Sequence, residues 1–208
     1  PAFARAAAVL NRCGLCAIAR LLRLGVGHLK VPGRSSSALA AVELIRRLLD
    51  ASRDAAVPVF FSQGLVAPDL SDVGLWKGWA HATGHSQVEG TPGAEIVPEL
   101  APLPGEHVVR KRRPSAFFRS DLDVFLRGHR VDTIIIAGSS MSGCVRATVV
   151  DGKAYRFKIL VPEECVFDRD EAPHAINLFD MEQKYAHVQP VGEVLAYIEG
   201  IRAARASA

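Results

Sequence analysis

The clearest evidence for the fold class is one stretch of sequence, Val131-Asp132-Thr133-Ile134-Ile135-Ile136-Ala137-Gly138-Ser139-Ser140-Met141-Ser142-Gly143-Cys144. Its first half is a run of β-branched and small apolar residues, which is typical of a strand buried on both faces of a parallel sheet. Its second half is a turn of small residues, and residues 144–155 then suit a helix. A buried strand, a turn and a helix in this order form one βα unit of an α/β fold.

Strand and helix patterns alternate along the chain. Further strands are expected at 57–61, 107–111, 157–162 and 187–191, and further helices at 35–55, 120–127, 173–185 and 192–201. Because βαβ crossovers are right-handed, this order predicts a three-layer, doubly wound, mostly parallel sheet with helices on both faces. The best candidate for a first strand is Leu15–Ala19. A long connection punctuated by Gly and Pro, residues 63–106, holds Trp76 and Trp79, and loops of that length usually serve a site.

The composition of the 208 residues is that of one globular domain, 1–208. With 49% hydrophobic and 23% charged residues, the chain falls outside the collagen-like, disulfide-dense and disordered classes. Every long apolar stretch contains a charge, so we expect no membrane span and no membrane partner. Four cysteines at irregular positions favour reduced thiols and a cytoplasmic location.

The first 42 residues contain six basic residues and no acidic one, although the net charge of the whole chain is only +3. The rest of the chain is therefore slightly acidic, which argues against a nucleic-acid-binding body. A transit peptide is a less favoured explanation, because no start of a mature domain is evident after Glu43. Residues 1–34 are anomalous in composition, and a sequence altered there by a change of reading frame would explain them.

Cys144 stands where chemistry is expected. Ligands of doubly wound sheets bind beyond the carboxyl ends of the strands, and the turn of residues 138–143 lies at that edge. The amino end of the following helix favours a thiolate, which is the nucleophilic form of cysteine. On geometry alone, a buried structural cysteine is an equally good interpretation.

Three motifs together resemble the isochorismatase-like cysteine hydrolases, most of all the N-carbamoylsarcosine amidase branch. They are Gly138–Thr148, Val161–Arg169 and the basic motif Lys111–Phe118. The resemblance covers roughly residues 37–200. It implies a homo-oligomer, a dimer or tetramer, that hydrolyses C–N bonds of small amides or ureido acids. It also implies a Cys, Lys and Asp triad, a thioester-type intermediate, release of ammonia and no cofactor.

By position, the resemblance makes Cys144 the nucleophile and Lys111 the second member of the triad. An ammonium beside a thiol favours the thiolate and can meet negative charge that develops on the attacked oxygen. The resemblance further implies an oxyanion hole from the backbone N–H groups of Ser140 and Cys144, with a cis peptide nearby. Arg169 would face a substrate carboxylate, for which its planar fork is suited, or it would form a structural salt bridge. Phe117, Trp76 and Trp79 would line the pocket or only pack.

The aspartate of the triad, which ends the first strand in this family, has no counterpart in this sequence. No acidic residue precedes Glu43, and the expected first strand would put Ala19, or else Ile18, at the place of the general base. Three hypotheses follow: a weakened enzyme, another base supplied by a different N-terminal arrangement, or the altered reading frame, which the composition favours. A family member that lacks catalysis and is kept for binding or assembly is the alternative function.

Metal chemistry has weak support. Cys13 and Cys16 have the C-x-x-C spacing of zinc or redox sites, but no second pair accompanies them. His81 and His85 are four residues apart, yet the zinc motif of the related nicotinamidases is missing. We therefore expect no metal.

Overall fold

A computed structural model describes residues 5–12, 38–73, 87–168 and 170–207. Seven strands form one sheet in the order β3-β2-β1-β4-β5-β7, and β6 pairs with β4 beside this path. All pairings are parallel. The strands are β1 (Ala6–Arg12), β2 (Val59–Gly64), β3 (His107–Lys111), β4 (Thr133–Ser139), β5 (Lys158–Pro162), β6 (Val166–Phe167) and β7 (His187–Gln189). The doubly wound, parallel fold is confirmed.

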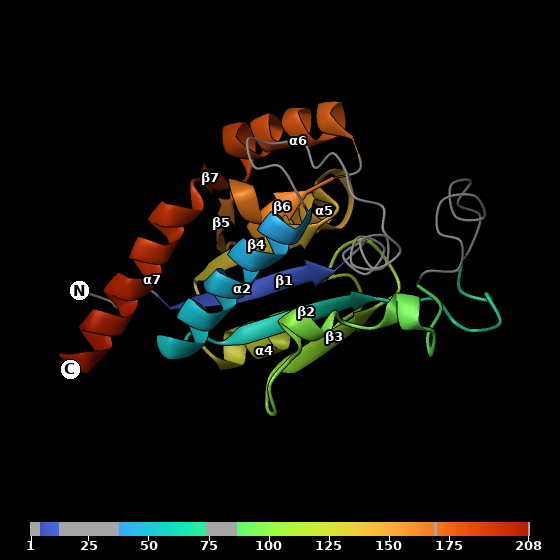
Figure 1. Cartoon of the computed structure of the whole chain (residues 1–208), viewed down its shortest axis with the longest axis horizontal. Helices are drawn as coiled ribbons and strands as arrows, with labels where there is room; N and C mark the ends of the chain where they lie inside the picture. The colour runs from blue at the N-terminus through green and yellow to red at the C-terminus, as the bar shows by residue number, and fades with distance from the viewer. Residues whose placement is uncertain (1–4, 13–37, 74–86, 169, 208) are drawn as a thin grey trace.

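Helices cover both faces of this sheet (Figure 1), and a hydrophobic core lies on each face. On one face, α2 (Ala38–Asp54) and α7 (Val191–Ala206) bury residues such as Ile45 and Ile198 against β1 and β2. On the other face lie α4 (Leu122–Gly128), α5 (Arg146–Ala154) and α6 (Glu171–Lys184), which contribute Leu122, Val149 and Met181. The alternation of side chains along β1 explains both cores, because Ala6, Ala8 and Leu10 face one layer while Ala7 and Val9 face the other.

The chain changes direction across the sheet at β1. From β1 it moves outward through β2 to the edge strand β3, and it then returns to β4 on the other side of β1. The carboxyl ends of β1 and β4 consequently flank a topological switch point, where open α/β sheets bind their ligands. This arrangement places a site at the ends of β3, β2, β1 and β4.

The expected position of the first strand is wrong. The strand between β2 and β4 is Ala6–Arg12, and it pairs over its whole length with Thr133–Ser139 of β4. The sequence Ala6-Ala7-Ala8 carries little β propensity, so the later run Leu15–Ala19 was the better match to a strand pattern. Tertiary burial decides the outcome, because small alanines fit a central strand that is covered by helices on both faces. Residues 15–19 lie outside the described residues.

Smaller elements depart from the sequence-based expectations. A π-helical turn, η3 (Met141–Val145), precedes α5, so the helix expected from Cys144 begins at Arg146. The strand β6 and three short 3-10 turns were not expected; the turns are η1 (Pro92–Ala94), η2 (Pro98–Leu100) and η4 (Glu163–Cys165). Part of the long connection is tied down by a bridge between Val66 and Val88.

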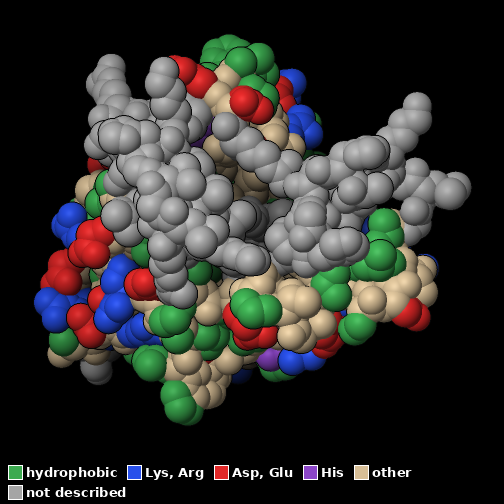
Figure 2. All heavy atoms as spheres, turned by 45° about the vertical axis from the view of Figure 1, so that its right-hand side comes forward, with side chains coloured by type: hydrophobic (Ala, Val, Ile, Leu, Met, Phe, Trp, Pro, Cys, Tyr) green, Lys and Arg blue, Asp and Glu red, His purple; other side chains and the backbone are tan. Residues whose placement is uncertain are grey.

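The surface of the described residues mixes charges of both signs. On the face shown in Figure 2, acidic and basic side chains lie side by side rather than forming a basic patch. Ion pairs join some of the charged side chains of the described residues, such as Arg112 with both Asp72 and Glu89. Among the helices described, none is long and apolar enough to cross a membrane.

Candidate active site

Lys111 and Cys144 come together from distant parts of the chain. Lys111 is the last residue of β3 at the edge of the sheet, and Cys144 lies in the η3 turn that follows β4. Both side chains are almost completely buried, with 2% and 7% exposed. A charged lysine is rarely buried without a partner, so its neighbours identify what it does.

The ammonium group of Lys111 has two partners at this site. Its Nζ donates to Cys144 Sγ over 3.3 Å and to the carbonyl oxygen of Arg113 over 3.3 Å. The backbone contact holds the side chain in place, and the cation beside the sulfur stabilises a thiolate electrostatically. The pair can therefore supply a nucleophile and a positive charge at one point.

The turn around Cys144 is shaped by backbone contacts. The peptide bond between Ser139 and Ser140 is cis. The carbonyl oxygen of Ser140 accepts N–H groups of Gly143 and Val145, both over 3.1 Å. Asp168, just after β6, accepts the N–H of Ser142. These contacts fold residues 139–145 into a compact loop; the oxyanion hole assigned to Ser140 and Cys144 stays a prediction.

Phe117 lies in the hydrophobic core. Its ring is 5% exposed and stacks on Tyr155 and Phe157, with centroids 5.2 and 6.0 Å apart. The ring also approaches Gly152 of α5. The substrate-binding role assigned to Phe117 stays a prediction.

Four other predicted positions fall outside the described residues. They are Ala19, Trp76, Trp79 and Arg169. The roles predicted for Arg169 and the tryptophans stay predictions. The strand that pairs with β4 ends at Arg12 and not at residue 19, which contradicts the first strand on which the choice of Ala19 rested.

Sequence reasoning missed two residues that support the site. Thr148 bonds both to the loop after Lys111 and to the carbonyl of Cys144, and Asp168 holds the turn through Ser142. A polar residue one helical turn after the proposed nucleophile was the available signal for Thr148. Nothing in the spacing of Asp168 reveals that it folds back onto Ser142, since this contact depends on β6 pairing beside β4.

Cys165 provides an internal comparison for Cys144. It is fully buried, and burial together with the neighbouring Glu164 raises the pKa of its thiol to about 12. We expect iodoacetamide at neutral pH to alkylate Cys144 well before Cys165, because of these two described cysteines only Cys144 has an ammonium partner. Peptide mass spectrometry over a time course measures both rates. Labelling of Cys165, Cys13 or Cys16 with Cys144 left unmodified would contradict the assignment.

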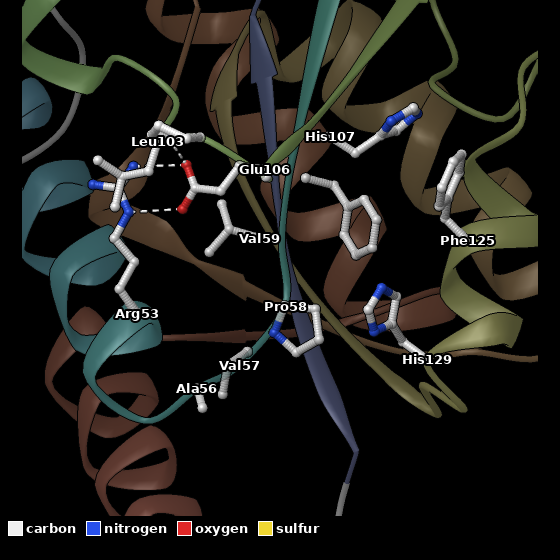
Figure 3. A pocket seen from close by; sticks show the side chains of 13 residues that line it. Arg53, Ala56, Val57, Pro58, Val59, Leu103, Glu106, His107, Phe125 and His129 are labelled. Carbon is white, nitrogen blue, oxygen red and sulfur yellow. Dashed lines mark hydrogen bonds and ion pairs between the residues drawn. The ribbon is translucent and has the colours of Figure 1, made fainter.

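A separate hollow of about 540 Å³ lies at the amino ends of β2 and β3, opposite to the carboxyl ends where Lys111 lies (Figure 3). Its aromatic side is formed by Phe60, His107, Phe125 and His129, whereas Lys111 lies at the far, carboxyl end of β3. On the other side, Arg53 donates twice to Glu106, over 2.8 Å each. The polar groups of this ion pair already have protein partners. The hollow is distinct from the reaction site because it lies at the other end of β3 from Lys111.

The Arg53–Glu106 pair makes stability depend on pH. Burial alone would raise the pKa of Glu106, but hydrogen bonds from Arg53 and from the N–H of Leu103 outweigh it and lower that pKa. Its contribution is therefore complete above the pKa of the unfolded chain and is lost as pH falls through the folded pKa. We expect Glu106→Gln to lower the free energy of unfolding by about 1 kcal/mol at pH 7.

Urea unfolding of both proteins at pH 7 and at about pH 3 checks this expectation. The difference between wild type and Glu106→Gln should shrink at the lower pH. Arg46→Gln is the matched control, since its pair with Asp50 is half exposed and should contribute less. A difference that stays constant with pH would show that the carboxylate of Glu106 is not the source.

Comparison with known proteins identifies close relatives. The family model described as the isochorismatase domain matches residues 30–193. Maleamate amidohydrolase of Pseudomonas putida is 40% identical over 151 residues, which are 72% of this chain and 70% of that protein. N-carbamoylsarcosine amidase of an Arthrobacter species is 32% identical over 162 residues, 76% of this chain and 61% of that protein. Both relatives are amidohydrolases, enzymes that hydrolyse amide C–N bonds.

Solved structures confirm the architecture. A cysteine hydrolase from Pseudomonas syringae pv. phaseolicola superposes with a TM-score of 0.75 over 95% of this chain and 93% of its own, at 23% identity.

Among the residues described here, no three His, Cys, Asp or Glu side chains gather as a metal site.

Proposed function

Because the chain belongs to the isochorismatase family, we propose that it is a cysteine-dependent amidohydrolase of a small amide or ureido acid. The observation that carries the proposal is the 3.3 Å contact between Lys111 Nζ and Cys144 Sγ at the carboxyl edge of the sheet. A buried charged pair usually stabilises a fold no better than a pair of well-packed apolar residues would. Stability therefore does not explain why a cation lies beside this sulfur. The pair is suited to nucleophilic chemistry.

The reaction follows from this arrangement. The thiolate of Cys144 attacks the carbonyl carbon, and the electron pair of the C=O bond moves to oxygen, where Lys111 and backbone N–H groups offset the charge. Collapse of this intermediate breaks the C–N bond and forms a thioester. The departing nitrogen takes up a proton and leaves as ammonia. Water then attacks the thioester, which releases the acid and restores the thiol.

The end of β1 is the third position of the site. Strand order places it between β3, which carries Lys111, and β4, which leads to Cys144. Across the sheet, Asn11 is paired with Gly138 and Ser62, and Ser62 with Val109, two residues before Lys111. Position 11 is therefore the last but one of β1, and through Ser62 it is level with the stretch of β3 that ends at Lys111. We therefore assign the place of the family aspartate to Asn11 rather than Ala19.

An asparagine at this place limits catalysis. A carboxylate can accept the thiol proton and pass it to the leaving group, whereas a neutral amide cannot. The asparagine therefore favours an enzyme that is slower than relatives with the complete triad. The same observation supports the alternative function, a family member retained for binding or assembly.

The substrate class that fits best is a small amide with a carboxylate. Maleamate and N-carbamoylsarcosine both carry one, and Arg169 follows Asp168, whose side chain is bonded to the turn of Cys144. We expect Arg169→Lys to weaken turnover of such acids about tenfold or more, since a planar fork is lost, and to leave neutral amides nearly unchanged. Equal losses on acidic and neutral substrates would instead show a structural role.

Ammonia release from a substrate panel tests the function. The panel contains maleamate, N-carbamoylsarcosine and a neutral amide of similar size, with Cys144→Ala as the blank. Release from at least one of the acids by wild type and not by the blank supports the proposal. Binding of an acid without any release of ammonia would favour the alternative.

We also propose that the protein works in the cytoplasm as a homo-oligomer, a dimer or tetramer. Ile176 and Phe179 support an assembly, because these apolar residues of α6 are 66% and 68% exposed in the single chain. Light scattering of wild type and of Phe179→Glu measures the mass. A monomeric wild type would contradict this part of the proposal.

A further inference from the structure

The loop that follows Lys111 and the helix that follows Cys144 are joined by one buried hydroxyl. Thr148 lies on α5, one turn after Cys144, and is completely buried. Its Oγ1 donates to the carbonyl oxygen of Cys144 over 2.7 Å and accepts the backbone N–H of Ala116 over 3.0 Å. A hydroxyl has one donor and two acceptor sites, so both bonds can exist at once.

This bridge spans the two halves of the proposed active site. Lys111 and Ala116 belong to one segment, which is further fixed by the bond from Lys111 Nζ to the carbonyl of Arg113. Cys144 belongs to the other segment, and its carbonyl oxygen receives the Thr148 hydroxyl. The position of Ala116 relative to Cys144 is thus set by two short bonds to one oxygen atom.

We propose that Thr148 is a positioning residue that sets the separation between Lys111 Nζ and Cys144 Sγ. It acts through the two backbone groups that it holds. The proposal rests on the proposed function, in which this separation determines how much thiolate forms near neutral pH. Small displacements matter here, because catalytic groups act only in a narrow range of geometry.

The experiment compares Thr148→Val with Thr148→Ser. Valine keeps the shape and removes the hydroxyl, which leaves the N–H of Ala116 and the carbonyl of Cys144 without this partner. Serine keeps the hydroxyl and is the matched control. The first readout is the rate of Cys144 alkylation by iodoacetamide against pH, which requires no substrate. The second is kcat and KM for the best substrate of the panel.

For Thr148→Val we expect the alkylation profile to move to higher pH, with a rate at pH 7 about tenfold below wild type. We also expect kcat to fall by about the same factor with little change in KM, while Thr148→Ser stays close to wild type in both. A lower Tm of Thr148→Val with an unchanged alkylation profile would overturn the proposal, since a purely structural hydroxyl would give that result. If Thr148→Val does not fold, Thr148→Ala is used instead, because alanine also lacks the hydroxyl and has the highest helix propensity. The pH profile of Cys144 alkylation in Thr148→Ala then tests the proposal in the same way.

Failure of the proposed function gives a different pattern. If wild-type Cys144 is alkylated readily but Cys144→Ala still releases ammonia, the nucleophile is wrong, and the effect of Thr148 on the thiol is still measured. If Cys144 is the nucleophile and Thr148→Val behaves as wild type, only the positioning role is wrong.

Discussion

Replacement of Cys144 by alanine is expected to reduce hydrolysis to the uncatalysed background. In the proposed reaction this sulfur forms the thioester, and it is the side-chain atom that accepts the hydrogen bond from Lys111 Nζ. Removal of a covalent nucleophile typically costs on the order of 10⁴-fold or more in kcat. Ammonia release at saturating substrate measures the loss. We expect a slow wild-type rate because the site has no aspartate as general base. A long incubation is therefore needed to measure ammonia release above the background.

Matched variants separate chemistry from stability in this test. Cys165→Ala removes the other described cysteine, which is buried and carries a raised thiol pKa, and it should keep the wild-type rate. Lys111→Met keeps most of the volume of the side chain and removes its charge. Its rate should fall about 10²-fold or more, because one charge-stabilising group is lost. Equal activity of wild type and Cys144→Ala would contradict the assignment.

The change Asn11→Asp is expected to raise the rate. Asn11 lies near the end of β1, in register with Gly138 of β4, which leads to Cys144, and with Ser62 of β2, the strand next to the one that carries Lys111. A carboxylate at this position can accept the thiol proton and return it to the leaving nitrogen. General acid–base catalysis of this kind is worth about 10²–10⁴-fold. Initial rates of both proteins on maleamate measure the gain.

Ala19→Asp is the control for this prediction, because an argument from the sequence alone puts the base there. The structure predicts a gain for Asn11→Asp and none for Ala19→Asp. The reverse result would show that the end of β1 is not the third position of the site. An intact mass of the purified wild-type protein that differs from the sequence would instead identify an altered reading frame.

The sequence predicted most of the fold because its central strand carries an unambiguous signal. The Ile-rich run of β4 and the alternation of strands and helices require a parallel sheet, and the motifs around Lys111 and Cys144 identify its reactive edge. Their contact could not be read from spacing, since it depends on the strand order that brings the ends of β3 and β4 to one edge. The family resemblance supplied what spacing alone could not.

The first strand shows where the sequence was insufficient. Ala6-Ala7-Ala8 has weak β propensity, and its burial between two helical layers becomes evident only once β2 and β4 are placed on either side. The sequence therefore suggested Ala19 for the general base, whereas the position of β1 leads to the proposal of Asn11. The packing of Phe117 against Tyr155 and Phe157 was not evident from the sequence either, because these rings come together only in the folded chain.

The decisive measurement for the thioester on Cys144 is the mass of the protein during turnover. Wild-type protein is mixed with saturating maleamate, quenched in acid at successive times and digested for peptide mapping. We expect an adduct with the mass of the substrate less ammonia, located on the peptide that contains Cys144 and missing in Cys144→Ala. An adduct on another side chain, or release of ammonia while the Cys144 peptide stays unmodified at every time, would contradict it.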